Sequence, residues 1–128
     1  MALFSKMNME APKLKKRAKP FAANNASKKM MEEQGWTCCV VEQVVPHCFI
    51  KRDCFGFGDL LCVSASKGIM LVQATGGLST NNLHPRITKL KAEPRHAIWL
   101  AAGGRIQVHS WQGKGNKRKL NCLEITKQ

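Results

Sequence analysis

Two polar side chains interrupt apolar segments in the middle of the chain, and both offer oxygen ligands. Asp59 stands in the segment FGFGDLL at the start of an apolar run, where a carboxylate has no packing role. Gln73 interrupts the segment IMLVQAT, and Thr75 follows on the same side of its strand. Carboxylate and amide oxygens are hard ligands that suit Mg²⁺. The pair is therefore a candidate metal site.

A hairpin is predicted to bring these two side chains together. Residues 57–65 and 69–75 are short apolar runs joined by Ser-Lys-Gly, which is typical of a tight connection between antiparallel strands. A simpler interpretation stays open, in which Asp59 caps the turn after Gly58 and Gln73 is a satisfied polar residue on a half-exposed strand.

The remaining pattern predicts an α/β fold, with a single mixed sheet of about five strands flanked by helices. We expect a helix over 26–34 capped by Asn24 or Asn25 and ended by Gly35, a strand over 36–45, and a loop or bent hairpin over 46–56. The pairs Gly76-Gly77 and Gly103-Gly104 are predicted turns. Pro85 suits the first turn of a helix, and Pro94 predicts a break before a second helix over 95–102. Strands are expected over 105–111 and 120–126, with a loop over 112–119.

The charge of the chain favours a polyanionic partner. Lys and Arg number 21 against 8 Asp and Glu, a formal net charge of +13 over 128 residues. Residues 1–24 are predicted to be a basic flexible N-terminal arm, which either neutralises phosphates or only solvates the chain. Residues 25–128 are long enough for one folded domain.

Several other chemistries are disfavoured. The six cysteines form no CxxC pair, which argues against zinc, and the absence of a signal peptide favours a reducing compartment, the cytoplasm. No run reaches the length of a membrane span. We expect the tryptophans to be core anchors and the histidines to lie at the surface or in loops: Trp36, Trp99 and Trp111; His47, His84, His96 and His109.

The motif residues resemble the PD-(D/E)xK nuclease pattern, here as Gly58-Asp59 and Gln73-Ala74-Thr75. The segment GWTCCVVE over 35–42, followed by the glycine-rich turn into Asp59, is similar to Holliday-junction resolvases and to small resolvase-like proteins of bacteriophage. The resemblance covers residues 25 to 126, about four fifths of the chain. It implies a restriction-endonuclease-like core, a homodimer and, for a phage protein, the host cytoplasm.

The resemblance also implies roles for individual residues. Asp59 ligates Mg²⁺ or Mn²⁺, Gln73 occupies the position of the second acidic ligand, and the carbonyl of Ala74 adds a contact. Glu42 is the expected third acid. The alternatives are Glu32 or Glu33 on the preceding helix and, less favoured, Asp53.

This sequence departs from the family pattern at two positions. Gln73 removes a negative charge, and Thr75 stands where the family has a lysine that positions the attacking water. A cation from elsewhere could reach the site, and Lys51, Arg86 and Lys89 are the candidates. Basic residues expected to hold the phosphate backbone flank the site: Lys51, Arg52, Arg86, Lys89, Lys91, Lys114, Lys117, Arg118 and Lys119.

Three functions follow as expectations. The first is a metal-dependent, structure-selective endonuclease acting on branched DNA, in which Glu42, Asp59, Gln73 and Thr75 serve catalysis. The second is a catalytically inactive nucleic-acid-binding protein on a nuclease fold. The third is a basic RNA-associated protein, for which Asp59 and Gln73 would be irrelevant. DNA is favoured over RNA.

Overall fold

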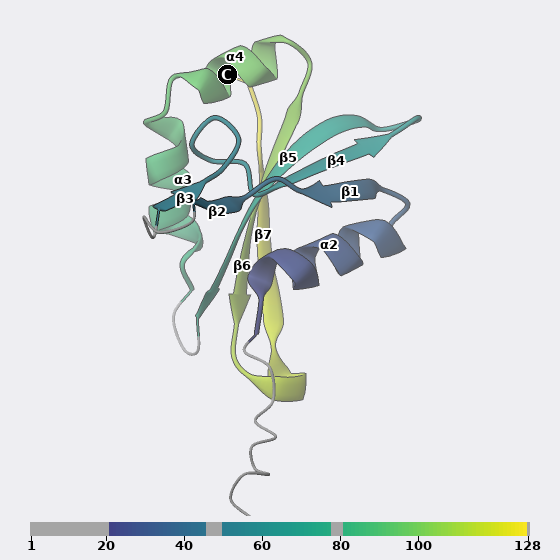
Figure 1. Cartoon of the computed structure of the whole chain (residues 1–128), viewed down its shortest axis with the longest axis vertical. Coiled ribbons are helices and arrows are strands. Elements are labelled where there is room, and N and C mark those ends of the chain that lie inside the picture. The colour runs from purple at the N-terminus through teal and green to yellow at the C-terminus, as the bar shows by residue number, and fades with distance from the viewer. Residues whose placement is uncertain (1–20, 46–49, 78–80, 128) are drawn as a thin grey trace, which may run out of the picture.

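The computed structural model describes residues 21–45, 50–77 and 81–127 (Figure 1). Residues 1–20 of the predicted basic arm lie outside the described residues. The helices are α2 (Ala23–Glu33), α3 (Leu83–Lys91) and α4 (Arg95–Ala101), with a 3₁₀ turn, η1 (Gly115–Lys117). The strands are β1 (Thr37–Val40), β2 (Gln43–Val45), β3 (Ile50–Arg52), β4 (Leu60–Ser64), β5 (Gly68–Gly77), β6 (Arg105–Gln112) and β7 (Lys119–Ile125).

Five of these strands form one mixed sheet in the order β1-β4-β5-β6-β7. The pairs β1/β4, β4/β5 and β6/β7 are antiparallel, and short connections join the last two pairs. Strands β5 and β6 are parallel, because α3 and α4 form a crossover between them. The predicted α/β class with a single mixed five-stranded sheet is therefore confirmed. Strands β2 and β3 pair separately.

Each face of the sheet carries its own apolar core. Helix α2 lies on one side of the sheet and α3 and α4 lie on the other (Figure 1). On the α2 side Met31 and Trp36 pack with Leu60, Met70 and Val72. The core on the opposite side contains Phe57, Leu71, Leu90, Ile106, Val108 and Ile125. Alternation along β5 thus points odd-numbered residues toward α3 and even-numbered residues toward α2.

The predicted single strand over 36–45 is wrong, because the chain leaves the sheet after Val40. The amides of Val41 and Glu42 both donate to the carbonyl of Asp59, at 2.8 and 3.3 Å, which ends the regular ladder. The chain then pairs as β2 with β3, so the segment over 46–56, for which a loop or bent hairpin was expected, supplies one strand of a hairpin. The Gly76-Gly77 turn is also corrected, since both glycines end β5, paired with Trp111 and Gln112 of β6.

The helices begin and end largely where Gly and Pro predict. Helix α2 follows the predicted span, but it starts at Ala23 and has no side-chain cap, so the capping prediction for Asn24 and Asn25 is wrong. The break at Pro94 is confirmed between α3 and α4. None of the helices in the described ranges combines the length and apolarity that crossing a bilayer requires.

The prediction of a surface histidine is wrong for His109, which is fully buried between α2 and β6. Its Nδ1 lies 2.8 Å from Ser27 Oγ, which also accepts from Trp111 Nε1 at 2.8 Å. Its Nε2 lies 2.9 Å from Gln107 Oε1. Gln107 Oε1 can only accept, so Nε2 carries a proton. Because burial lowers the pKa of the ring, the ring is neutral at pH 7 and Nδ1 accepts from Ser27. His84 is exposed as predicted, and His47 lies outside the described residues.

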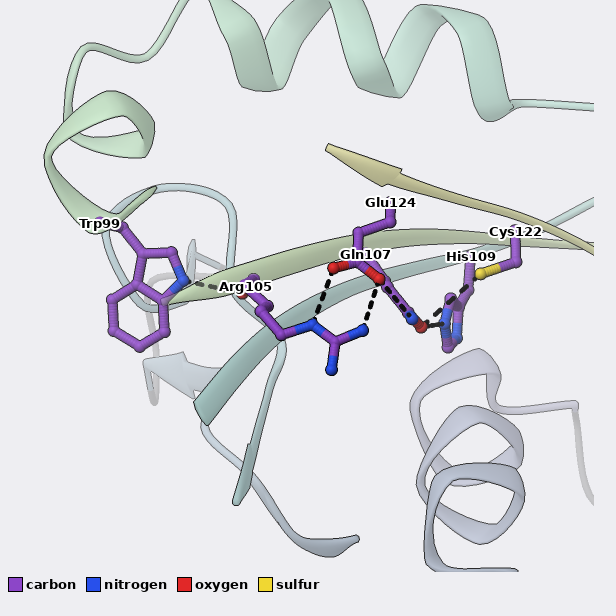
Figure 2. A network of polar contacts seen from close by, with 6 residues as sticks. All are labelled: Trp99, Arg105, Gln107, His109, Cys122 and Glu124. Atoms are coloured by element: carbon purple, nitrogen blue, oxygen red, sulfur yellow. Dashed lines mark hydrogen bonds and ion pairs between the residues drawn. The ribbon is translucent and has the colours of Figure 1, made fainter. Parts of the chain in front are cut away.

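The same network continues along β6 and β7 (Figure 2). Gln107 Nε2 donates to Glu124 Oε1 at 3.2 Å, and Arg105 forms a two-bond ion pair with Glu124 at 2.8 Å. Trp99 Nε1 donates to the carbonyl of Arg105 at 2.8 Å and ties α4 to the sheet. Burial lowers the pKa of His109 to about 4. Protonation of the His109 ring to its charged form therefore destabilises the folded protein.

We expect His109 to make the protein less stable in acid. The folded pKa, about 4, lies below the ordinary 6.5, so the unfolded chain binds the extra proton between these values. The contribution of the neutral ring to the free energy of unfolding is fully present above pH 6.5. It falls by on the order of 3 kcal/mol as the pH drops to 4. Urea unfolding at several pH values should show a shallower acid dependence for His109→Gln. His84→Gln, at an exposed position, is the control, and an unchanged slope in His109→Gln would contradict the assignment.

Candidate functional site

A cavity of about 560 Å³ lies where β4 begins, β5 ends and α2 starts. Its walls include Asp59, Gln73 and Thr75 from the two central strands, and Ala23 and Asn24 from α2. The other walls come from the β1–β2 junction, the turn before β4, and α3, through Glu42, Asp53, Gly56, Arg86 and Lys89. The structure thus brings the predicted motif residues into one cavity.

A tight turn fixes Asp59 at the start of β4. Cys54 and Gly58 exchange two backbone hydrogen bonds of 2.8 Å, and the amide of Asp59 then donates to the carbonyl of Val72 at 2.9 Å. A side chain at position 58 would force the buried Leu71 to shift, because a Cβ atom would lie 2.7 Å from Leu71 Cδ2 and 3.2 Å from the carbonyl of Cys54. Asp59 is buried, and its Oδ2 accepts from the amide of Ala74 at 3.0 Å.

Gln73 lies beside this carboxylate on β5. It follows Leu71 by two residues and therefore faces the α3 side of the sheet, as Leu61, the β4 partner of Leu71, does. Gln73 is only 5% exposed, yet its Oε1 has no hydrogen-bond partner within the described residues. A buried oxygen without a hydrogen bond lowers the stability of the fold by about 1–3 kcal/mol. This oxygen is available to a ligand in the cavity.

The third predicted acid, Glu42, also reaches the cavity. Asn24 Nδ2 donates to Glu42 Oε1 at 2.8 Å, so the first turn of α2 holds this side chain in place. Sequence reasoning missed this role of Asn24, because the contact joins residues eighteen positions apart. Asp53, the less favoured candidate, lines the same cavity.

The electrostatics of the cavity disfavour a bare carboxylate. Burial, together with the negative charges of Glu42 and Asp53, raises the pKa of Asp59 to about 6. The hydrogen bond from the Ala74 amide and the charge of Arg86 act in the opposite direction without cancelling this effect. A cation in the cavity would relieve the cost of ionising Asp59.

Helix α3 supplies a positive charge to this cavity. Arg86 Nη2 donates to Thr75 Oγ1 at 3.4 Å, and Lys89 lies one turn further along the helix. The start of α3 is held by Asn82, whose amide donates to Ser110 Oγ at 3.0 Å and whose Nδ2 donates to the carbonyl of Gly76 at 3.4 Å. Arg86 therefore brings a guanidinium to the hydroxyl of Thr75.

Other predicted residues lie elsewhere. Glu32 and Glu33 are exposed and do not line this cavity. Glu32 forms an ion pair with Lys28 at 3.0 Å. The side chain of Lys51 is not among those that the structure describes. The remaining basic residues also lie outside this cavity. Arg118 is half-buried and lines a neighbouring cavity, and the others are exposed: Arg52, Lys91, Lys114, Lys117 and Lys119.

The donor set suits a small cation that keeps much of its water. Within the described ranges, no three side chains of His, Cys, Asp or Glu are grouped closely enough to share a metal ion. Asp59 and the free Gln73 oxygen offer one carboxylate and one amide ligand, and Mg²⁺ accepts so few protein ligands more readily than Zn²⁺ does. Comparison of the chain with protein family models, with curated proteins and with solved structures found no match.

We expect Asp59→Asn to stabilise the metal-free protein at neutral pH. The folded pKa of about 6 lies above the ordinary 3.8, so stability from the protonated form is present below pH 3.8 and is lost as the pH rises through 6. The full shift corresponds to about 3 kcal/mol, and we expect a gain of roughly 1–3 kcal/mol at pH 7.

Chemical unfolding with a metal chelator present measures this gain. The gain should vanish near pH 4, where Asp59 is protonated in the folded wild type. Glu33→Gln, which removes an exposed carboxylate, is the control and should change little. A loss of stability in Asp59→Asn at pH 7 would contradict the electrostatic account of this cavity.

Proposed function

We propose that this chain is a metal-dependent, structure-selective endonuclease that cleaves branched DNA with Mg²⁺ or Mn²⁺. The observation that supports this most is the unpartnered, buried oxygen of Gln73 beside the carboxylate of Asp59. An apolar side chain would fill this position at lower cost, because the amide oxygen receives no hydrogen bond from the described residues. A cation ligated by both side chains accounts for the oxygen and for the buried acid together.

The arrangement of elements supports the resemblance to PD-(D/E)xK nucleases and a restriction-endonuclease-like core. Helix α2 is followed by the antiparallel strands β1, β4 and β5, then by α3 and a strand parallel to β5. Asp59 immediately precedes β4, and Gln73, Ala74 and Thr75 lie near the end of β5. These are the places that the resemblance implies for the two motif segments.

The residues of the site would have different roles in this reaction. A bound Mg²⁺ would supply an activated water and would neutralise charge on a phosphodiester. Asp59 and Gln73 would hold the cation, and Glu42, fixed by Asn24, would complete the acidic wall. The Ala74 amide orients the Asp59 carboxylate through its 3.0 Å hydrogen bond.

Arg86 takes the part of the missing motif lysine in this proposal. Its guanidinium reaches Thr75 and carries the positive charge that threonine lacks. A guanidinium can bind two phosphate oxygens at once and so can stabilise the charge that develops on the scissile phosphate. Thr75 keeps a hydroxyl that can orient water.

The basic surface would hold the DNA. Phosphate contacts by Lys and Arg release counterions and fix the position of the duplex without reading bases. Cleavage of two strands of a branched substrate requires two sites, so we propose a homodimer. Light scattering of the purified protein measures this oligomeric state directly.

The first test is cleavage of labelled four-way-junction, flap, single-stranded and duplex DNA with Mg²⁺ or Mn²⁺. We expect branched DNA to be cut and Asp59→Ala to abolish cutting. In calorimetry, Gln73→Leu should weaken metal binding at least about tenfold, because it removes an oxygen ligand, whereas Gln73→Glu should tighten it. Gln34→Leu, at an exposed glutamine, is the control. Metal-independent cleavage, or unchanged metal affinity in Gln73→Leu, would refute the site.

The role of Arg86 has its own test. Arg86→Ala should lower the single-turnover cleavage rate by about 100-fold, because it removes the cation nearest Thr75. DNA affinity should fall much less. Lys91→Ala removes an exposed charge from the last turn of α3 and is the matched control. Equal cleavage rates for the two variants would rule out Arg86 as the catalytic cation.

Thr75 also favours a second candidate function, a DNA-binding protein that keeps the nuclease fold without catalysis. In this case Asp59→Ala should leave DNA affinity unchanged and no substrate should be cut. The informative variant is Thr75→Lys, which restores the motif lysine. Cleavage that arises only in Thr75→Lys would identify the wild-type chain as a binder.

A further inference from the structure

Beside the candidate site lies a second cavity, of about 290 Å³, that no motif residue lines. Its walls are the ring of Phe21, Ala23, the guanidinium of Arg118, and the three glycines 76, 77 and 113. Phe21, Ala23 and Gly76 also line the cavity that contains Asp59. The two cavities therefore adjoin at Phe21.

An aromatic and cationic stack forms one wall. The Cζ atom of Arg118 lies 3.8 Å from the centre of the Phe21 ring, so the guanidinium covers a face of that ring. Phe21 meets Trp111 in an edge-to-face contact, with 6.1 Å between ring centres. Trp111 is itself held by its hydrogen bond to the buried Ser27 Oγ. The stack thus rests on the buried network of His109.

Glycine backbone lines the rest of this cavity, and Gly76 packs against the Phe21 ring. A Cβ atom at Gly76 would lie 3.3 Å from the Phe21 ring, and one at Gly113 would lie 2.9 Å from the carbonyl of Lys117. Gly113 has φ +100° and donates to the carbonyl of Gly77 at 3.1 Å. This cavity, called the slot below, therefore combines a planar cation stacked on an aromatic ring with glycine backbone that carries no side chains.

We propose that this slot binds an unpaired DNA base next to the phosphate that lies at Asp59, an inference that rests on the proposed function. Bases stack on aromatic rings and on guanidinium planes, and stacking does not depend on base identity. A base in duplex DNA is stacked on its neighbours, so the slot selects strands with a free base, as at a branch or a flap. Although Phe21 is an aromatic residue at the surface, 36% exposed, the slot and the stack give it a role in substrate choice.

The partner chemistry follows from charge and position. The slot carries Arg118 and adjoins the cavity that Arg86 and Lys89 line, which suits a polyanionic strand. With one base in the slot, the adjoining phosphate of the strand would lie toward the cavity of Asp59 and Gln73. DNA is the partner we propose, and an RNA strand of the same sequence serves as the comparison.

The experiment measures binding without cleavage. A junction DNA with 2-aminopurine as an unpaired base at the branch, and the corresponding fully paired duplex, are titrated with full-length protein in Ca²⁺. We expect the wild type to prefer the unpaired base and to change the fluorescence of the probe. Phe21→Leu keeps an apolar side chain against Trp111 but cannot stack. It should weaken binding of the unpaired substrate by about 5- to 150-fold, the range for loss of one stacked base, and should leave duplex affinity unchanged.

A matched aromatic control is present in the chain. Phe55 is exposed and has Arg95 5.8 Å from its ring centre, but it lines neither cavity. Phe55→Leu should leave both affinities unchanged. Arg118→Lys keeps the charge and loses the plane, so it should weaken the unpaired substrate more than the duplex. Circular dichroism confirms that each variant is folded.

The outcomes separate this inference from the proposed function. Equal binding of paired and unpaired DNA by the wild type, or no loss in Phe21→Leu, would overturn the slot even if the protein cleaves DNA. Selective loss in Phe21→Leu together with no metal-dependent cleavage would support the slot and refute the nuclease. Tighter binding of the RNA probe than of the DNA probe would overturn DNA as the partner.

Discussion

Asp59 connects three strands of the sheet through its own atoms. Its amide donates to Val72 of β5, its carbonyl accepts from Val41 and Glu42 at the end of β1, and its carboxylate accepts from the amide of Ala74. The carbonyl contacts set the point at which β1 leaves the sheet, and the contact with Ala74 sets the orientation of the carboxylate. The cavity, the departure of β2 and the placement of Glu42 all depend on this residue.

The two faces of the sheet deal with buried polar groups differently. On the α2 face, Ser27, Trp111, His109 and Gln107 satisfy one another, so the described groups of that network are fully hydrogen-bonded. On the α3 face, Gln73 Oε1 has no partner among the described residues and Asp59 is buried with a raised pKa. A satisfied network stabilises a fold, whereas an unsatisfied pair costs stability and marks a place for a ligand. The α3 face is therefore the face that offers buried polar groups to a ligand.

Local patterns predicted the elements better than they predicted the contacts between them. The hairpin of Asp59 and Gln73 followed from two apolar runs and a short connection, and the break in the crossover followed from Pro94 alone. Contacts between distant segments were invisible to such reasoning. The bond from Asn24 to Glu42 and the burial of His109 under α2 depend on how α2 packs, and neither has a spacing signal in the sequence. Alternation along β6 placed His109 opposite Ile106 and Val108, and that face proved to be covered by a second helix.

The cavity is an acidic pocket within a chain of net charge +13. Glu42, Asp53 and Asp59 face a space that a DNA phosphate would also have to enter, so phosphate and bare carboxylates repel each other there. A cation between them removes this repulsion. In the proposed function, cation and DNA therefore bind with positive heterotropic coupling, and each must raise the affinity of the other by the same factor. In that proposal the basic exterior would hold DNA in the absence of metal, and the phosphate would enter the cavity only when the cation is present.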